Sequence, residues 1–312
     1  MSDLAHTPEY TIRQMSPADL GIVRQIDRDA FDMMRRQERR PSHALNLRTL
    51  DNMRAALRRP HPGVVIEWPP GRVVGYCFTH VWGSLGWLGT LGIAPRSQGI
   101  GLGRAVIAAG LDVLRRAGCR VLALETMPDS GKNLALYTRL GLDPRHLTVL
   151  CQGAPPQVTS THFERWNGDG DSLRQIASGL VPGLDPAPAA RWLAEEQAGD
   201  TLIWSEGGQP VAFAALRAGP RRDEGFPSSL TVEAAACLPE AAHLWPRYLG
   251  EMQTHARNQG KSGLVLPVNT HQAVLLRGLL DAGLRIVHTR VRMATGESLG
   301  GPESILLMTL AM

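Results

Sequence analysis

Lysine is almost absent from this chain, and so are the features of several broad protein classes. Only Lys132 and Lys261 are lysines among its 33 basic residues, so arginine supplies nearly all of the positive charge. Arginine binds phosphate groups in a bidentate manner. The net charge is only +4, far below what a nucleic-acid-binding surface carries, so we expect no nucleic-acid partner and at most a small anionic ligand.

Closely spaced cysteines and long apolar runs are also missing. The cysteines form no C-x-x-C pair, so we expect no metal site, no disulfide framework and a reducing compartment. No run approaches the ~20 apolar residues of a membrane span. The first ten residues, MSDLAHTPEY, carry acids and a proline where a signal peptide needs an apolar stretch. We therefore expect a cytoplasmic protein without a membrane partner. The four cysteines are Cys77, Cys119, Cys151 and Cys237.

The 312 residues predict two domains, and local patterns give the order of elements in the first half. Ser16-Pro17 is typical of a helix start. Glycine and proline turns join three strands as hairpins, whereas a strand, a helix and a strand further on require a parallel crossover. The first half is thus an α+β domain with a mixed, mostly antiparallel sheet flanked by helices. The predicted helices cover 47–58, 101–117 and 132–141, and the predicted strands 63–70, 72–82, 85–95, 120–128 and 147–153.

The second half repeats this order after a linker at 153–157. Residues 115–142 and 257–284 both read helix end, glycine, strand, proline, loop, helix, Gly-Leu. An internal repeat of about 150 residues indicates duplication. We therefore predict two tandem domains, 1–155 and 156–312. In the second, we expect helices over 172–180, 187–198, 242–258 and 272–283, and strands over 201–208, 210–218, 229–238, 263–269 and 285–293.

One short stretch, IAPRSQGIGLG from Ile93 to Gly103, carries the chemistry. Glycines after a strand let a ligand approach the backbone, and the free N–H groups of the following helix favour an anion such as pyrophosphate. The stretch is not the G-x-x-x-x-G-K-S/T of a nucleoside-triphosphate loop. It is not the G-x-G-x-x-G of a dinucleotide site either. A tight packing turn remains the alternative interpretation.

The same stretch resembles the acyl-CoA signature V/I-x-P-x-x-Q/R-G-x-G-x-G/A of the GCN5-related N-acetyltransferases, the GNAT family. A second motif, LETMPDSGKNLALYTRLGL, resembles the family's L-E-V-x-x-x-N-x-x-A-x-x-x-Y-x-x-x-G-F and follows at the proper distance. The resemblance covers roughly residues 10–152. It implies two tandem GNAT-like domains and acetyl-CoA as the acyl donor, with no metal.

The resemblance also implies which residues meet the donor. Backbone N–H groups of the loop would hold the pyrophosphate, and the end of the preceding strand would pair with the pantetheine arm and donate to the thioester oxygen. Ser130 replaces the family asparagine before the last helix, although it can still cap that helix. The implied cofactor-binding residues are Leu91, Gly92, Ile93, Gln98, Gly99, Ile100, Gly101, Leu102, Gly103, Arg104, Ser130 and Asn133.

Two residues are the catalytic candidates. Tyr137 falls on the family tyrosine that protonates the leaving thiolate; the alternative is a core tyrosine with a satisfied hydroxyl. Glu125 ends the apolar run VLAL, where a carboxylate must be paired or functional. Its spacing to Tyr137 is similar to that in GNATs that acetylate ribosomal-protein N-termini, so it is the expected general base. A chain of waters and His80 are the other candidates for this base.

The second half lacks both motifs. PEAAHLWP stands where the loop should fall, and Leu279 stands at the tyrosine position, so we expect a degenerate domain that binds no CoA. The plan is similar to tandem GNAT enzymes of the mycothiol synthase type, in which the second domain is active. Because the intact motifs are in the first half here, that substrate is not carried over. A second group of side chains either lines a shared cleft or packs in the core, namely Trp192, Trp204 and Trp245.

The sequence thus predicts an acetyl-CoA-dependent N-acetyltransferase acting on a primary amine. The alternative is a non-catalytic protein that responds to acyl-CoA through a partner-recognition surface on its second half. The acceptor, a small-molecule or peptide amine, stays open, and so does the oligomeric state.

Overall fold

A computed structural model describes residues 9–37, 49–219, 226–296 and 299–310. Within these ranges the chain forms two compact units, which are treated separately below. Unit 1 takes in 9–81 and 86–122, and unit 2 takes in 82–85 and 123–310, each with the gaps just given.

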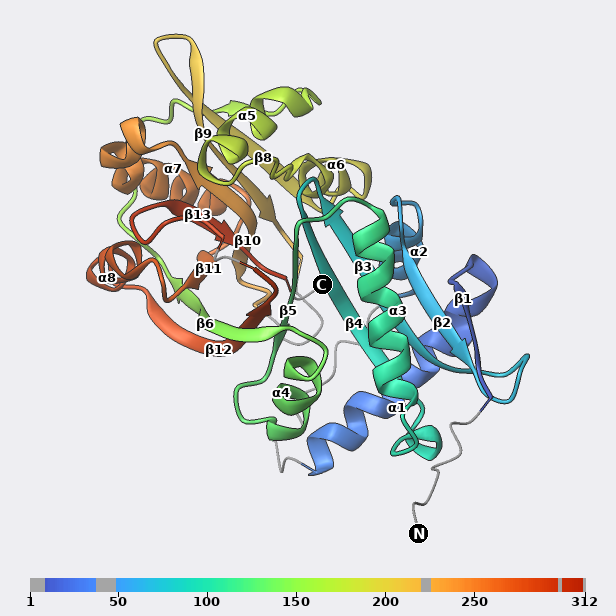
Figure 1. Ribbon diagram of the computed structural model, residues 1–312. Helices are drawn as coiled ribbons and strands as arrows, with labels where there is room; N and C mark the ends of the chain where they lie inside the picture. Colours follow the sequence, from blue (N-terminus) through green and yellow to red (C-terminus); the bar gives the residue numbers. More distant parts are fainter. Residues whose placement is uncertain (1–8, 38–48, 220–225, 297–298, 311–312) are drawn as a thin grey trace. The chain divides into compact units, whose positions relative to one another are not determined.

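Unit 1 is a small sheet with helices on both faces (Figure 1). Its strands are β1 (Thr11–Gln14), β2 (Gly63–Glu67), β3 (Val73–Trp82) and β4 (Leu85–Ile93), and they lie side by side in that order. The pairs β1–β2 and β2–β3 are antiparallel. The helices are α1 (Leu20–Gln37), α2 (Leu50–Leu57) and α3 (Leu102–Arg116). The helix predicted from Ser16-Pro17 begins as a short 3-10 turn, Pro17–Asp19, that runs into α1.

Alternation along β3 explains how the helices divide between the two faces. Tyr76 and Phe78 point to one face and join the apolar residues of α1 and α2 in a single core. Cys77 and Thr79 point to the other face, where they lie beside Gly110 of α3. Because successive side chains of a strand point in opposite directions, one strand anchors both helical layers. The glycine stretch of the sequence joins β4 to α3.

Unit 2 contains a mixed and mostly antiparallel sheet, in agreement with the predicted fold class. The strand order is β5-β12-β6-β11-β10-β9-β8-β7, and β13 also pairs with β10. Only the β10–β11 pair is parallel among the described pairs of this unit. The strands are β5 (Val121–Thr126), β6 (Asp143–Gly153), β7 (Glu164–Arg165), β8 (Gly199–Glu206), β9 (Gln209–Arg217), β10 (Ser229–Cys237), β11 (Gly263–Asn269), β12 (Arg285–Ala294) and β13 (Ile305–Met308).

The helices of unit 2 pack on this sheet around one apolar core. Helix α7 contributes Trp245, Tyr248, Leu249 and Met252 to the core, and α8 contributes Leu275 and Leu279. The helices are α4 (Gly131–Thr138), α5 (Gly170–Leu180), α6 (Ala187–Glu195), α7 (Trp245–Asn258) and α8 (Ala273–Asp281); a 3-10 segment, Pro239–Leu244, leads into α7. No helix in the described ranges is long and apolar enough to cross a membrane.

The internal repeat is visible in the structure as a constant spacing of 142 residues. Helix α4 corresponds to α8, β5 to β11 and β6 to β12 at this spacing. Two glycine pairs at the same spacing adopt left-handed conformations, Gly118 with Gly260 and Gly141 with Gly283, at φ of 83°, 71°, 85° and 87°. Left-handed residues that end helices are usually glycine. The two halves therefore share their local turns as well as their order of elements.

The pairing of the repeated strands could not be read from the sequence. Strand β6, from the first half, lies between β12 and β11 of the second half, and β12 lies between β5 and β6. The predicted division into domains 1–155 and 156–312 stays a prediction. Strands β1, β7 and β13 were not predicted, because each is only two to four residues long. Residues 47–48 of one predicted helix lie outside the described residues; the rest of that helix is α2.

Candidate functional site

The loop between β4 and α3 is open above its glycines. Gly99 and Gly101 have φ values of 86° and 90°, a region that glycine adopts without steric cost. A Cβ atom built on either of them would meet no atom within 4 Å. The neighbouring side chains alternate: Leu102 is buried and anchors the start of α3, while Ile100 and Arg104 are exposed. The loop therefore presents its backbone to free space.

Hydrogen bonds connect this loop to the end of β4 and to the first turn of α3. The side-chain amide of Gln98 donates to the carbonyl oxygen of Ile93 at 3.0 Å, which ties the loop to the last residue of β4. Helix α3 closes its first turn with the bond from the N–H of Ala105 to the oxygen of Gly101, and this turn has no acidic residue. The N–H groups at a helix start have no partner within the helix and carry partial positive charge. The geometry thus fits an anion of the size of pyrophosphate.

The end of β4 is backed by a buried polar pair. A Cβ atom on Gly92 would lie 3.1 Å from the ring of Tyr76, a tight contact, so glycine here lets that ring pack against the strand without being displaced. The Tyr76 hydroxyl donates to the carboxylate of Asp27, a residue of α1 that is fully buried. Leu91 and Ile93 flank Gly92 on the same strand. This packing holds the three residues whose backbone was predicted to meet the acyl donor.

His80 lies away from this end of β4. Its ring stacks on Trp87 at 5.0 Å, and its Nδ1 atom is 3.3 Å from the guanidinium of Arg59. The nearest atoms to a Cβ on Gly89 belong to the His80 ring. Gly89 and Gly92 are three residues apart, which is about 10 Å along a strand. Direct proton transfer requires contact or one bridging water.

Glu125 lies at the centre of a buried ion-pair cluster in unit 2. Its Oε1 atom accepts hydrogen bonds from Arg292 at 2.8 and 3.1 Å and from the hydroxyl of Thr148 at 2.6 Å. Its Oε2 atom faces Arg290 and the backbone N–H of Leu310, each at 3.4 Å. The Glu125 side chain is completely buried, and both arginines are nearly so. The two guanidinium groups come from β12, next to β5 in the sheet.

The charge balance of this cluster determines how Glu125 titrates. Burial disfavours the charged carboxylate, but the positive charges of Arg292 and Arg290 outweigh that effect and hold the pKa of Glu125 below its ordinary value. A carboxylate whose pKa is lowered is a weaker proton acceptor than a free one. Sequence reasoning missed both arginines, although their alternation in RIVHTRVRM places them on one face of a strand.

The remaining predicted residues lie on α4. Tyr137 is buried, and its backbone oxygen accepts from Leu140 and Leu142 at the end of the helix. Asn133 donates to the hydroxyl of Thr126 at 3.4 Å. Ser130 occupies the N-cap position, but its side chain makes no capping hydrogen bond, so the capping predicted for it is wrong. Glu125, Ser130, Asn133 and Tyr137 belong to unit 2, whereas the glycine loop and Leu91–Ile93 belong to unit 1.

The corresponding region of the second half has a different structure. Gly99, Gly101 and Gly103 correspond to Ala241, His243 and Trp245 at the repeat spacing, and Gln98 corresponds to Glu240. Residues 239–244 form a 3-10 segment that continues into α7 without an open loop. Trp204 and Trp245 are part of the apolar core, and Trp204 stacks on Tyr248 at 4.9 Å, so core packing explains these two tryptophans. Trp192 is half-buried on α6.

Comparison with known proteins agrees with this geometry. The sequence profile of the acetyltransferase (GNAT) family matches residues 23–142. The chain is 38% identical over 92 residues to mycothiol acetyltransferase of Kocuria rhizophila, 28% of this chain and 30% of the relative. It is 31% identical over 112 residues to mycothiol acetyltransferase of Thermomonospora curvata, 35% of this chain and 38% of the relative. The chain thus aligns with well under half the length of these curated relatives.

Two solved structures share the fold over nearly the whole chain. A candidate acetyltransferase from Pyrococcus horikoshii superposes with a TM-score of 0.69 at 14% identity, covering 97% of this chain and 95% of that one. A GCN5-related N-acetyltransferase from Sphaerobacter thermophilus gives a TM-score of 0.54 at 15% identity, covering 92% and 95%. At these identities the likeness concerns the fold. The profile match assigns residues 23–142 of this chain to the acetyltransferase (GNAT) family.

Proposed function

We propose that the protein transfers an acetyl group from acetyl-CoA to a primary amine. The observation that supports this most directly is the open loop after β4, in which two left-handed glycines face free space at the start of α3. Acetyl-CoA would supply an activated thioester, and the loop residues Gln98 to Arg104 would hold its pyrophosphate through backbone N–H groups. Gln98 would act through its bond to Ile93, which fixes the loop to the strand.

The end of β4 would stabilise the charge that develops during attack on the thioester. Leu91, Gly92 and Ile93 would align with the pantetheine arm, and a backbone N–H of this segment would donate to the carbonyl oxygen. Tyr76 packs against Gly92 and is itself held by Asp27, so this pair would position the strand. Tyr137 would protonate the leaving thiolate, as its place in the family motif implies.

Proton removal from the amine is assigned differently from the sequence-based prediction. Glu125 is buried, accepts bonds from Arg292 and has a lowered pKa, so we propose that it joins β5 to β12 and is not the base. The His80 ring lies beside Gly89, three residues along β4 from Gly92 and two from Leu91, so it stays the alternative base, acting through a bridging water. An amine that binds in its neutral form, or loses its proton to water, fits this arrangement best.

A small molecule is the acceptor that the comparisons favour. The curated relatives are named mycothiol acetyltransferases, after a small molecule. The profile match and the intact glycine loop both lie in the first half of this chain. We therefore extend to this protein the class of acceptor, a small-molecule amine, and leave its identity to the assay below.

Two variants at one position test donor binding. Gly101→Gln and Gly101→Glu place side chains of equal size on the same left-handed backbone, so they share any strain and differ only in charge. We expect Gly101→Glu to bind acetyl-CoA roughly ten- to a hundredfold more weakly than Gly101→Gln, because the carboxylate stands where the pyrophosphate would lie. Calorimetry measures both affinities.

Turnover is tested by thiol release from acetyl-CoA across a panel of small amines and peptides. Release that depends on an amine supports the proposal. Acetyl-CoA binding without release on any amine would contradict transfer and favour a protein that responds to acyl-CoA without catalysis. Equal affinities of the two Gly101 variants would remove the loop from donor binding.

A further inference from the structure

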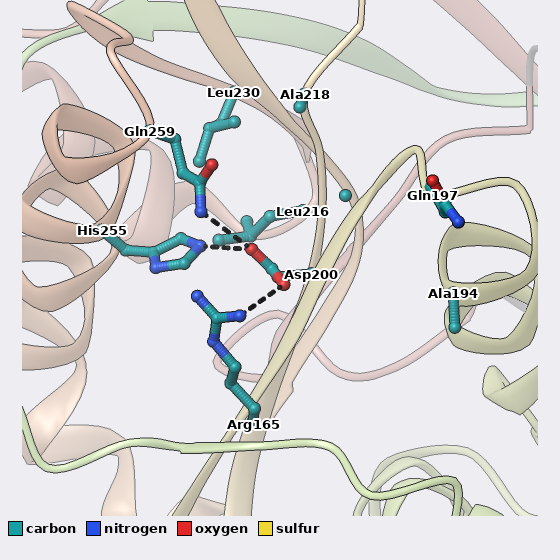
Figure 2. Close-up of a pocket in the computed structure, with 10 residues that line it drawn as sticks. Arg165, Ala194, Gln197, Asp200, Leu216, Ala218, Leu230, His255 and Gln259 are labelled. Carbon is teal, nitrogen blue, oxygen red and sulfur yellow. Dashed lines mark hydrogen bonds and ion pairs between the residues drawn. The ribbon is translucent and has the colours of Figure 1, made fainter.

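Unit 2 contains a cavity that the acetyl-transfer chemistry does not use. It has a volume of about 370 Å³, enough for a small metabolite, and its wall combines charged, amide and aliphatic side chains (Figure 2). The charged groups are Arg165 of β7 and Asp200 of β8, and His255 of α7 lies beside them. Leu216, Ala218 and Leu230 form an apolar wall.

Three side chains contact the half-buried carboxylate of Asp200. His255 Nε2 lies 3.0 Å from Asp200 Oδ2 and Gln259 Nε2 donates to the same oxygen at 3.3 Å, whereas Arg165 reaches the other oxygen only at 3.5 Å. Figure 2 shows these three groups converging on the carboxylate. His255 is 4% exposed, while the Arg165 side chain is 63% exposed. The contact with Arg165 is therefore the longest of the three, and His255 is the partner that packing fixes, because Gln259 is exposed.

The surroundings leave the inner part of the cavity negative. Burial lowers the pKa of His255 more than the neighbouring Asp200 raises it, which favours the neutral imidazole, and the Nε2 atom of that ring lies 3.0 Å from the carboxylate. Helix α6 ends at Glu195 and α7 ends at Asn258, and residues at both ends line the cavity. Helix C-termini carry partial negative charge and favour cations. Arg165 at the exposed side is the positive group of the wall.

This cavity is not a remnant of a CoA site. The segment that corresponds to the glycine loop precedes the first residue of α7, Trp245, whereas His255 and Gln259 lie at the other end of that helix. Ten residues of helix separate Trp245 from His255, which is about 15 Å. The two locations are at opposite ends of the same element.

We propose that the cavity binds a small zwitterion of the α-amino acid class, with its ammonium group on Asp200 and its carboxylate on Arg165. Arg165 and Asp200 form a long ion pair with one exposed partner, and a zwitterion replaces it with two charge-assisted contacts of matching sign. A free amine satisfies Asp200 but leaves Arg165 without an anion, and a free carboxylate does the reverse. Leu216, Ala218 and Leu230 favour an aliphatic side chain of moderate size. The inference is independent of the acetyl acceptor.

Calorimetry on the full-length protein tests this with L-leucine, L-alanine and L-phenylalanine. Two matched analogues of leucine accompany them: isopentylamine, which lacks the carboxylate, and 4-methylpentanoate, which lacks the ammonium. We expect saturable binding of at least one amino acid, and affinities at least about tenfold weaker for the analogues, since each loses one charged hydrogen bond. No saturable binding of any of the three amino acids at millimolar concentration overturns the proposal. Analogues that bind as tightly as leucine overturn it too.

Variants place the binding in this cavity. Arg165→Gln should weaken binding about tenfold, and Arg277→Gln, on an exposed face of α8, is its control. Ala194→Phe fills the cavity from the exposed side of α6 without removing a polar group, and Ala273→Phe, exposed on α8, is the matched control. Both cavity variants keep the core of unit 2 intact, and their melting temperatures check this. Binding that survives both cavity variants unchanged contradicts the site.

Discussion

The starts of helices α3 and α7 occupy equivalent positions in the repeat and have opposite chemistry. Before α3, glycines turn the chain so that backbone N–H groups face open space. Before α7, the 3-10 segment 239–244 uses its N–H groups internally, as when Trp245 donates to the oxygen of Ala242. Pro246 in the first turn of α7 has no N–H at all, and Glu240 places a carboxylate nearby. One start can receive an anion and the other repels it.

The difference separates what the fold requires from what a ligand requires. Three pairs of elements, α4 with α8, β5 with β11 and β6 with β12, and the left-handed glycines that end helices keep the 142-residue spacing in both halves. The glycines of the loop, Tyr137 and Glu125 are not kept, since Leu279 and Pro267 stand at the last two positions. Residues that are present in only one half are therefore the ones to test, either for a role in ligand binding and catalysis or for an ion pair that only that half forms.

The largest effect is expected from the ion-pair cluster of Glu125, the residue that corresponds to Pro267 of the second half. Arg292→Met removes the closest guanidinium from the buried Glu125 and should lower the free energy of unfolding by about 3–5 kcal/mol. Urea denaturation measures the loss. Arg277→Met on the exposed face of α8 is the control and should change stability little. A loss below about 1 kcal/mol, the size of a surface ion pair, would show that the cluster is not a structural element.

A second substitution tests the role of Tyr137, which is replaced by Leu279 at the corresponding position of the second half. Tyr137→Phe removes only the hydroxyl, and if that hydroxyl protonates the thiolate, kcat should fall by about 10²- to 10⁴-fold with acetyl-CoA affinity unchanged. Tyr248→Phe, in the other half, is a matched control because its hydroxyl bonds to Glu206 and its ring packs on Trp204. Steady-state kinetics compare the two. Equal kcat values in both variants would return Tyr137 to a packing role.

The smallest effect concerns His146 on β6, which stacks on His271 at 4.6 Å. Burial and the neighbouring His271, Arg145 and Arg292 lower the pKa of His146. The unfolded chain then binds more protons than the folded one in mild acid, so stability is present above the ordinary histidine pKa and is lost as the pH falls through the lower folded pKa. His146→Gln should reduce the drop in melting temperature between about pH 7.5 and about pH 5. A drop as large as in the wild type would exclude this contribution.

Local signals in the sequence predicted most of the elements. Hydrophobic periodicity and Gly-Pro punctuation found the longer strands and helices, and the glycine motif identified the open loop before its geometry was known. The strand exchange of β6 and β12 was out of reach, because which strands pair depends on packing between residues far apart in the chain. The ion pairs of Glu125 depend on that pairing and were missed with it.

The cavity of unit 2 shows the same limit more strongly. Arg165, Asp200, His255 and Gln259 come from distant parts of the chain and form no motif. Each is an ordinary surface or helix residue when read alone. Only the fold brings the other three side chains to the carboxylate of Asp200.

The pairing of β6 with strands of the second half also determines what a truncation of the gene would do. Strand β6 has both of its sheet neighbours, β11 and β12, in the second half of the chain. A gene shortened to the first half would encode a strand with two bare edges, which invites aggregation. A truncation is therefore harmful even though the second copy has no glycine loop. The second half is therefore needed to complete the sheet. Because it has no CoA loop, its surface can evolve to bind a different ligand.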